Sequence, residues 1–141
     1  MPTSKMPDST DRIGAQSSKG RRWTGRVLSA VAILFLAMDA MFKFIRPAPV
    51  VQSFERLGYP LTTAIALGTL LLTCTILYAI PRTTTLGAAL LTGYLGGAVS
   101  AHLRVGDPLF SHVLFPVYLG AMLWGGLYLR DARFRAMLRS Y

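Results

Sequence analysis

Four long apolar tracts, separated by short polar segments, dominate the chain. They cover residues 27–45, 61–80, 85–103 and 109–129. Apolar side chains occupy every side of these tracts instead of alternating with polar ones, which favours helices over barrel strands. Each tract approaches the roughly 20 residues that a helix needs to cross about 30 Å of hydrocarbon. The pattern therefore predicts an all-α fold, a four-helix transmembrane bundle.

The segments outside these tracts predict two further features. Residues 47–58 combine a starting proline, Pro49, with one apolar face and a final Gly58. This is typical of a short amphipathic helix, here an interfacial helix between the first and second spans. Residues 1–22 are rich in Ser, Thr, Pro and Gly and lack periodicity, so we expect a disordered tail. Residues 23–141 then form a single four-span membrane domain.

The basic residues predict how the bundle is oriented. The net charge is +9, and the 15 lysines and arginines flank the apolar tracts. Eleven fall on the side of the two termini, and four on the other side: Lys43, Arg46, Arg56 and Arg104. Because positive charge collects on the cytoplasmic side, both termini are expected in the cytoplasm. Basic residues at span ends favour the lipid bilayer as the partner and argue against nucleic acid.

Small residues mark one face of the third tract. Ala89, Gly93, Gly97 and Ala101 recur at four-residue spacing. Such spacing lets helix backbones approach closely in lipid. We therefore expect Gly93 and Gly97 to lie at a helix contact.

Six ionisable residues lie within or beside the tracts, where charge is costly. The predicted topology brings all six to the outer side of the bilayer, where they form a candidate polar cluster. Asp39 and Lys43 are four residues apart on one helix face, so they form either a local ion pair or a ligand-binding pair. The cluster consists of Asp39, Lys43, His102, Arg104, Asp107 and His112.

The cluster does not match a recognised catalytic or metal-binding pattern. His102 and His112 could ligate a metal or exchange protons with a quinone, but only Asp107 is an obvious third ligand, so no metal site is predicted. The chain has one cysteine, and neither a nucleophile–base motif nor a phosphate-binding loop is evident. The sequence therefore argues against catalysis and leaves an accessory redox role open.

Five short motifs lie in and between the apolar tracts: DAMFK at 39–43, FERLGYP at 54–60, YAIPRT at 78–83, TGYLGGA at 92–98 and HLRVGDPLFSH at 102–112. Together these motifs resemble the DoxX-like family of small bacterial membrane proteins. The resemblance covers about residues 23–138 and implies a four-helix bundle in a bacterial cytoplasmic membrane. It also implies a loose association with thiosulfate:quinone oxidoreductases or terminal oxidases. The absence of a Cys-x-x-Cys pair separates the chain from membrane thiol–disulfide relatives.

Three functions agree with these features. The first is an accessory subunit of membrane redox chemistry that contacts other redox subunits and a quinone through the outer cluster. The second is a module that binds or transports a small, partly polar ligand. The third is a structural envelope protein without a ligand. Quinone is the one cofactor that the pattern suggests, because its site needs an apolar slot with a few hydrogen-bonding groups.

Overall fold

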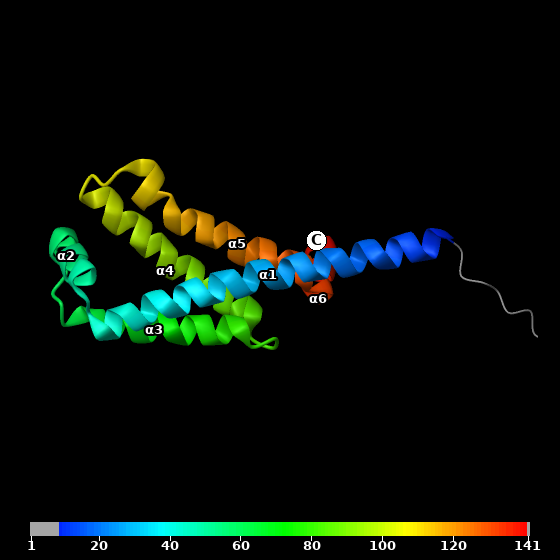
Figure 1. The fold of residues 1–141 in the computed structure, drawn as a ribbon, viewed down its shortest axis with the longest axis horizontal. Helices are drawn as coiled ribbons and strands as arrows, with labels where there is room; N and C mark the ends of the chain where they lie inside the picture. Colours follow the sequence, from blue (N-terminus) through cyan, green and yellow to red (C-terminus); the bar gives the residue numbers. More distant parts are fainter. Residues whose placement is uncertain (1–8, 141) are drawn as a thin grey trace, which may run out of the picture.

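The computed structural model describes residues 9–140 and is helical throughout its regular elements (Figure 1). This confirms the predicted all-α bundle. In chain order the elements are α1 (Ser9–Ile45), α2 (Ala48–Leu57), α3 (Thr63–Ala79), α4 (Thr84–Arg104), the π-helical turn η1 (Leu109–Val113), α5 (Phe115–Arg130) and α6 (Ala132–Arg139).

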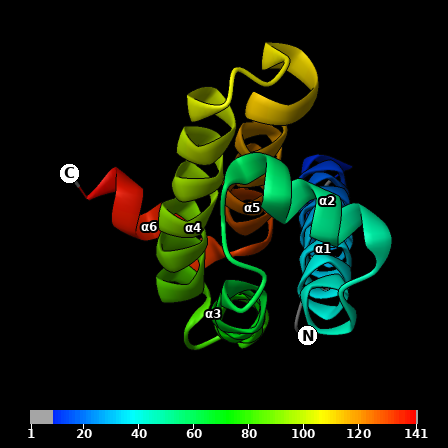
Figure 2. The ribbon, with the colours of Figure 1, turned by 90° about the vertical axis from the view of Figure 1, so that its left-hand side faces the viewer.

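The bundle consists of α1, α3, α4 and α5, with α1 packed on both α3 and α5, and α4 on the same two helices. Helix α6, the end of the described chain and the α3–α4 connection lie toward one end, and α1 projects beyond that end (Figure 1). Helix α2 and the α4–α5 connection lie at the opposite end. Viewed from there, α2 crosses over the end of the bundle (Figure 2). We call this the α2 end.

The helices are suited to a membrane by length and composition. Three helical stretches are long and apolar enough to cross one: Ser18–Ile45, Thr84–Arg104 and Leu109–Arg130. Helix α3 is also apolar but shorter, at 17 residues. Large apolar side chains such as Leu34, Ile65 and Leu90 face outward from the bundle. An outer surface of this kind is solvated by lipid, because water would not favour so much exposed apolar area.

Helix α1 begins well before the predicted span. It starts at Ser9, so residues 9–22 are helical where the sequence favoured a disordered tail. Once the apolar part of α1 has formed, adding further residues costs little, and no proline interrupts the chain between Ser9 and Pro47. Residues 1–8 of the predicted tail lie outside the described residues.

The fourth predicted span, residues 109–129, is divided into two elements. The amide of Leu114 donates to the carbonyl of Leu109 at 2.9 Å, which closes the π-helical turn η1. Pro116 has no amide hydrogen, so it cannot continue a regular ladder back into η1. Helix α5 therefore begins afresh at Phe115.

Helix α2 confirms the short helix predicted at residues 47–58. Pro49 lies in its first turn, and Gly58 ends it with a left-handed backbone, φ 69°. The amides of Gly58 and Tyr59 donate to the carbonyls of Glu55 and Phe54 at 3.0 and 2.9 Å. Phe54 is buried, so the apolar face of α2 turns toward the bundle.

Close helix contacts occur at glycines other than the two predicted ones. A methyl group on Gly126 of α5 would stand 2.5 Å from Ser29 Oγ of α1. On Gly87 of α4 it would stand 2.2 Å from the backbone nitrogen of Tyr78 in α3. On Gly93 or Gly97 it would meet nothing within 4 Å. Among the described residues, therefore, no helix contacts Gly93 or Gly97, which differs from the predicted helix contact.

A buried hydroxyl joins three helices near these close contacts. Tyr78 Oη of α3 donates to the Leu123 carbonyl of α5 at 2.7 Å. Its single proton is then used, so the 3.0 Å bond to Ser29 of α1 is donated by Ser29 Oγ. Both side chains are almost completely buried. In a low-dielectric interior such bonds are costly to break, so this node fixes the relative positions of α1, α3 and α5.

The contrast between glycines gives a direct test of packing. Gly87→Ala should lower the free energy of unfolding by about 1–3 kcal/mol, because its methyl group overlaps the α3 backbone. Gly93→Ala is the matched control in the same helix and should be neutral or slightly stabilising, since alanine favours helix more than glycine does. The measurement is unfolding by SDS titration in mixed micelles. Equal stability of the two variants would contradict the α3–α4 contact.

Candidate ligand-binding site

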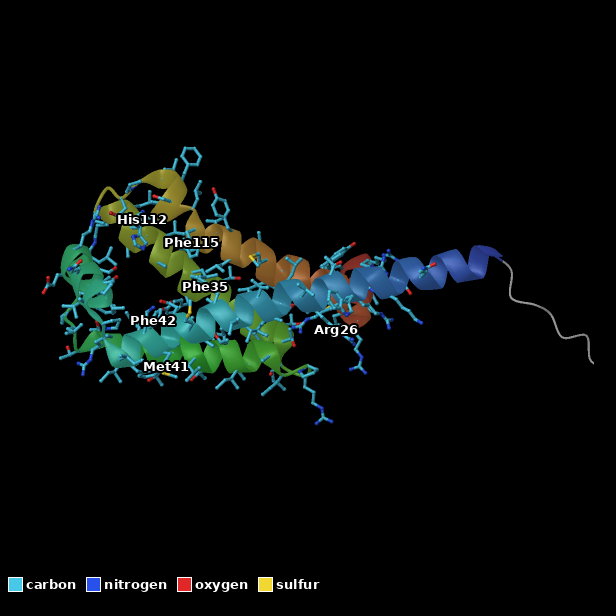
Figure 3. The ribbon with its side chains drawn as sticks, viewed as in Figure 1. Arg26, Phe35, Met41, Phe42, His112 and Phe115 are labelled. Carbon is cyan, nitrogen blue, oxygen red and sulfur yellow. The ribbon has the colours of Figure 1, made fainter. Side chains whose placement is uncertain are left out.

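A cavity of about 470 Å³ opens between α1, α3, α4 and α5, below α2. Its walls are largely apolar, and the rings of Phe35 and Phe115 lie against each other with centroids 5.2 Å apart (Figure 3). Gly93 and Gly97 also line it, and their missing side chains leave space along α4. Other apolar lining residues are Leu36, Phe54, Leu57, Leu67, Leu70, Leu95, Ala98, Ala101, Pro116 and Leu119.

Six polar side chains also line this cavity. Lys43 Nζ donates to Asp39 Oδ2 at 2.6 Å, one helical turn apart on α1. The lysine side chain is 13% exposed and the aspartate 39%, so the ammonium is the more enclosed of the two. Ser53 of α2, Tyr59 just after α2, and Tyr94 and His102 of α4 complete the set. The cavity is thus amphiphilic, with one ion pair and four further hydrogen-bonding groups.

His102 connects the cavity to a buried carboxylate. Its Nδ1 lies 2.6 Å from Asp107 Oδ2, and the Asp107 side chain is only 2% exposed. A carboxylate accepts, so Nδ1 carries the proton that it donates. In a neutral imidazole, Nε2 then has a free lone pair and acts as an acceptor. The carboxylate therefore fixes the hydrogen-bonding character of a cavity-lining ring.

Helix α2 is attached to the bundle through the same carboxylate. The Arg56 guanidinium pairs with Asp107 Oδ1, which has no other polar partner. Arg104 of α4 donates to the Leu57 carbonyl at the C-terminal end of α2, and its guanidinium lies 5.7 Å from the centre of the Tyr59 ring. Two arginines, one from each side, thus hold α2 across the end of the cavity.

Asp107 is held in its ionised form. The hydrogen bond from His102 is the largest cause that lowers the pKa of this carboxyl below its ordinary value. Burial acts in the opposite direction, and the positive charges of Arg56 and of the two histidines add to the lowering. At neutral pH the carboxylate therefore carries a full negative charge against Arg56.

The six residues of the predicted cluster all lie toward the α2 end but divide among three places. Asp39, Lys43 and His102 line the cavity, while Arg104 and Asp107 attach α2. His112 lies at the α4–α5 connection (Figure 3), with its ring 5.8 Å from that of His102 and its Nδ1 2.8 Å from Ser111 Oγ. Within the described residues, no three His, Cys, Asp or Glu side chains are grouped as metal ligands.

Some residues of this region were not predicted from the sequence as site residues. Arg56 was counted only among the basic residues that predict the orientation in the membrane, and Ser53 and Tyr94 were not considered as site residues. The signal for Arg56 and Ser53 was their place in an amphipathic helix that must fold back on the bundle. Tyr94 lies between Gly93 and Leu95, so a polar side chain beside the small-residue face was the available signal.

The lowered pKa of Asp107 determines how stability depends on pH. Asp107→Asn should melt below the wild type at pH 7, because it removes the charge that pairs with Arg56. That difference should persist down to about pH 4, the ordinary range of an aspartate, and disappear as the pH falls through the lower folded-state pKa. Melting both proteins across this pH range checks it. A difference that instead grows as the pH falls from 7 to 6 would assign the stabilisation to histidine charge, because histidine gains its proton in that direction.

The comparisons with known proteins now bear on this architecture. The chain matches the model of the DoxX-like family over residues 27–126, which is more than half of its length. Neither the search of curated proteins nor the search of solved structures gave a match. The matched region runs from the apolar part of α1 to the glycine of α5 that packs on Ser29. The chain is therefore a membrane protein of the DoxX-like family.

Proposed function

We propose that the protein binds a small lipophilic molecule with a polar head in the cavity beneath α2, and that a quinone is the class of ligand that fits best. The observation that carries this proposal is the amphiphilic lining of the cavity. Ligand pockets typically measure roughly 300–1,000 Å³ and combine apolar walls with a few convergent polar groups. The cavity's volume of about 470 Å³ falls within that range.

The hydrogen-bonding character of the lining favours a quinone head. A quinone ring carries two carbonyl acceptors and no donor. The cavity offers hydrogen-bond donors in the Lys43 ammonium and in the hydroxyls of Ser53 and Tyr94. The aromatic side chains of Phe35 and Phe115 supply flat apolar surface for a ring. An isoprenoid tail would follow the apolar side chains of the helices into lipid.

The polar groups outside the cavity support binding over transport through the bundle. Farther from the α2 end, Tyr78 and Ser29 use their hydroxyls within the helix node, and Thr75 Oγ1 donates to the Leu71 carbonyl at 2.7 Å. A path for a polar solute needs polar groups available at several depths. Here the available groups gather at the α2 end.

We also propose a membrane location, an orientation and a class of partner for the protein. The family resemblance supports a bacterial cytoplasmic membrane. Positive charge near the chain ends supports an orientation with both termini in the cytoplasm and α2 on the outer side. As a quinone-binding protein it would serve other membrane redox subunits, as an accessory that holds or delivers the quinone. This is the partner class that we propose.

Filling the cavity tests ligand binding. Gly97→Leu should reduce binding of decylubiquinone at least tenfold without loss of stability, because the leucine side chain enters open space in the cavity. Gly96→Leu is the matched control: its side chain also meets nothing within 4 Å, but Gly96 does not line the cavity. Binding is measured on purified protein in detergent, together with the quinone extracted after purification. If both variants bind like the wild type, the cavity is not the quinone site.

A second variant tests the polar groups of the cavity without filling its volume. Asp39→Asn combined with Lys43→Met removes the ion pair without leaving either charge unpaired in the membrane. If the pair binds the ligand head, this variant should also lose about tenfold in affinity, as expected for a hydrogen bond to a charged group. Normal binding by the variant would show that the pair does not bind the ligand. Its role would then be only to neutralise the two charges of α1 within the membrane.

The orientation is tested separately. Reporter fusions at Tyr141 and near Ser18 should both show cytoplasmic activity, and a fusion near Gln52 should show outer-side activity, because the lysines and arginines are concentrated at the chain ends. A periplasmic C-terminus would overturn the proposed topology, and α2 would then cover the cavity from the cytoplasm.

A further inference from the structure

A second hollow, of about 490 Å³, lies at the end of the bundle opposite α2. Its lining combines arginines with small side chains: Arg21, Ala132, Arg135, Ala136, Arg139 and Ser140. Arg21 belongs to α1 and the others to α6 and its last turn, so the hollow lies between these two helices. We call it the basic groove.

Helix α6 is held in a fixed position, which makes the groove a built feature. Asp131 Oδ1 accepts from the amides of Arg133 and Phe134 at 2.8 and 3.3 Å and so caps the helix. The ring of Phe134 packs against Trp124 of α5, with centroids 5.7 Å apart. Arg135 is buried, and its Nη1 donates to the carbonyls of Tyr128 and Leu129 at 2.6 and 2.9 Å.

The charge of the groove is not neutralised by the carboxylates of the described residues. The ion pairs among the described residues lie at the α2 end, away from the groove. They join Asp39 to Lys43, and Asp107 to Arg56 and His102. Asp131, the acid nearest in sequence, is used as the α6 cap. Ala132 and Ala136 leave room between the arginines, which an anion would fill. Arginine binds phosphate oxygens through paired, charge-assisted hydrogen bonds.

We propose that the basic groove binds the phosphate of an anionic phospholipid, with Arg21 and Arg139 as its ligands and Ser140 as a further donor. Arg135 contributes positive charge to the wall. The rest of α6 favours a lipid over a soluble anion. Met137 and Leu138 are about half exposed and apolar, at 48% and 52%, as expected of a helix whose other side dips into acyl chains. This site is separate from the cavity beneath α2 and does not depend on the proposed quinone.

The test is native mass spectrometry of the full-length protein in detergent, titrated with phosphatidylglycerol or phosphatidylcholine. The wild type should retain phosphatidylglycerol in preference. Arg21→Gln combined with Arg139→Gln should weaken this binding roughly thirtyfold, since each arginine near a lipid surface contributes about fivefold. Ala136→Leu keeps every charge but occupies the space between the arginines, so it should weaken binding as well.

Arg133→Gln is the matched control, because it removes one positive charge from the same helix outside the groove. It should bind phosphatidylglycerol like the wild type. A loss as large as that of the double variant would overturn the site in favour of general charge attraction. Displacement of bound lipid by millimolar inorganic phosphate would overturn the lipid assignment and identify a site for soluble anions. Helical circular dichroism of each variant verifies that α6 and the bundle are retained.

Discussion

The hydroxyl of Tyr78 organises the arrangement of the helices. It accepts from Ser29 of α1 and donates to the Leu123 carbonyl of α5, so one side chain of α3 reaches two other helices. In lipid, helices gain little from hydrophobic burial against each other, so close contact and interhelical hydrogen bonds carry more of their association. Gly87 and Gly126 permit the close approach that these bonds require. Away from this node, the helices have room to separate toward the α2 end.

The cavity forms because the helices are close together at the Tyr78 node and separate toward the α2 end, where α2 covers it. Where the helices separate, the space is lined by Gly93 and Gly97 on one side and by the Asp39–Lys43 pair on another. An open end would expose these groups, and α2 closes it with Phe54 and Leu57. The arginine contacts of α2 then determine how firmly the cavity is closed. His102 lines the cavity and also binds Asp107, the carboxylate that attaches α2, so the cavity wall and its cover are connected through one imidazole.

The local features of the fold were predictable from sequence, and its tertiary contacts were less so. Hydrophobic pattern, length and proline positions gave the helices, and Gly58 gave the end of α2. The extension of α1 to Ser9 was not predicted, because the composition of residues 9–22 shows only that they have few apolar side chains to bury. A helix that has formed in the apolar segment can nevertheless continue into a polar one.

The same distinction explains the errors at the candidate site. Small residues at four-residue spacing show that one face of α4 lacks bulky side chains. They do not show whether a helix or a cavity lies against that face. Gly93 and Gly97 were therefore assigned to packing, while Gly126, which does pack closely, stands in a less regular pattern. Topology alone placed the six ionisable residues at one end. The role of Arg56 depends on α2 folding back over the bundle, and no local pattern encodes that contact.

The shortness of α3 affects the surrounding bilayer. At about 1.5 Å per residue, its 17 residues reach roughly 25 Å, a few ångströms less than the usual hydrocarbon thickness of about 30 Å. Helix α1 has 28 residues in its spanning stretch, so the two neighbours differ in hydrophobic length. Such mismatch is relieved by thinning of the lipid beside the short helix and by tilting of the long one. The protein should thus favour the thinner regions of its membrane, and lipids beside α3 should be more compressed than those beside α1.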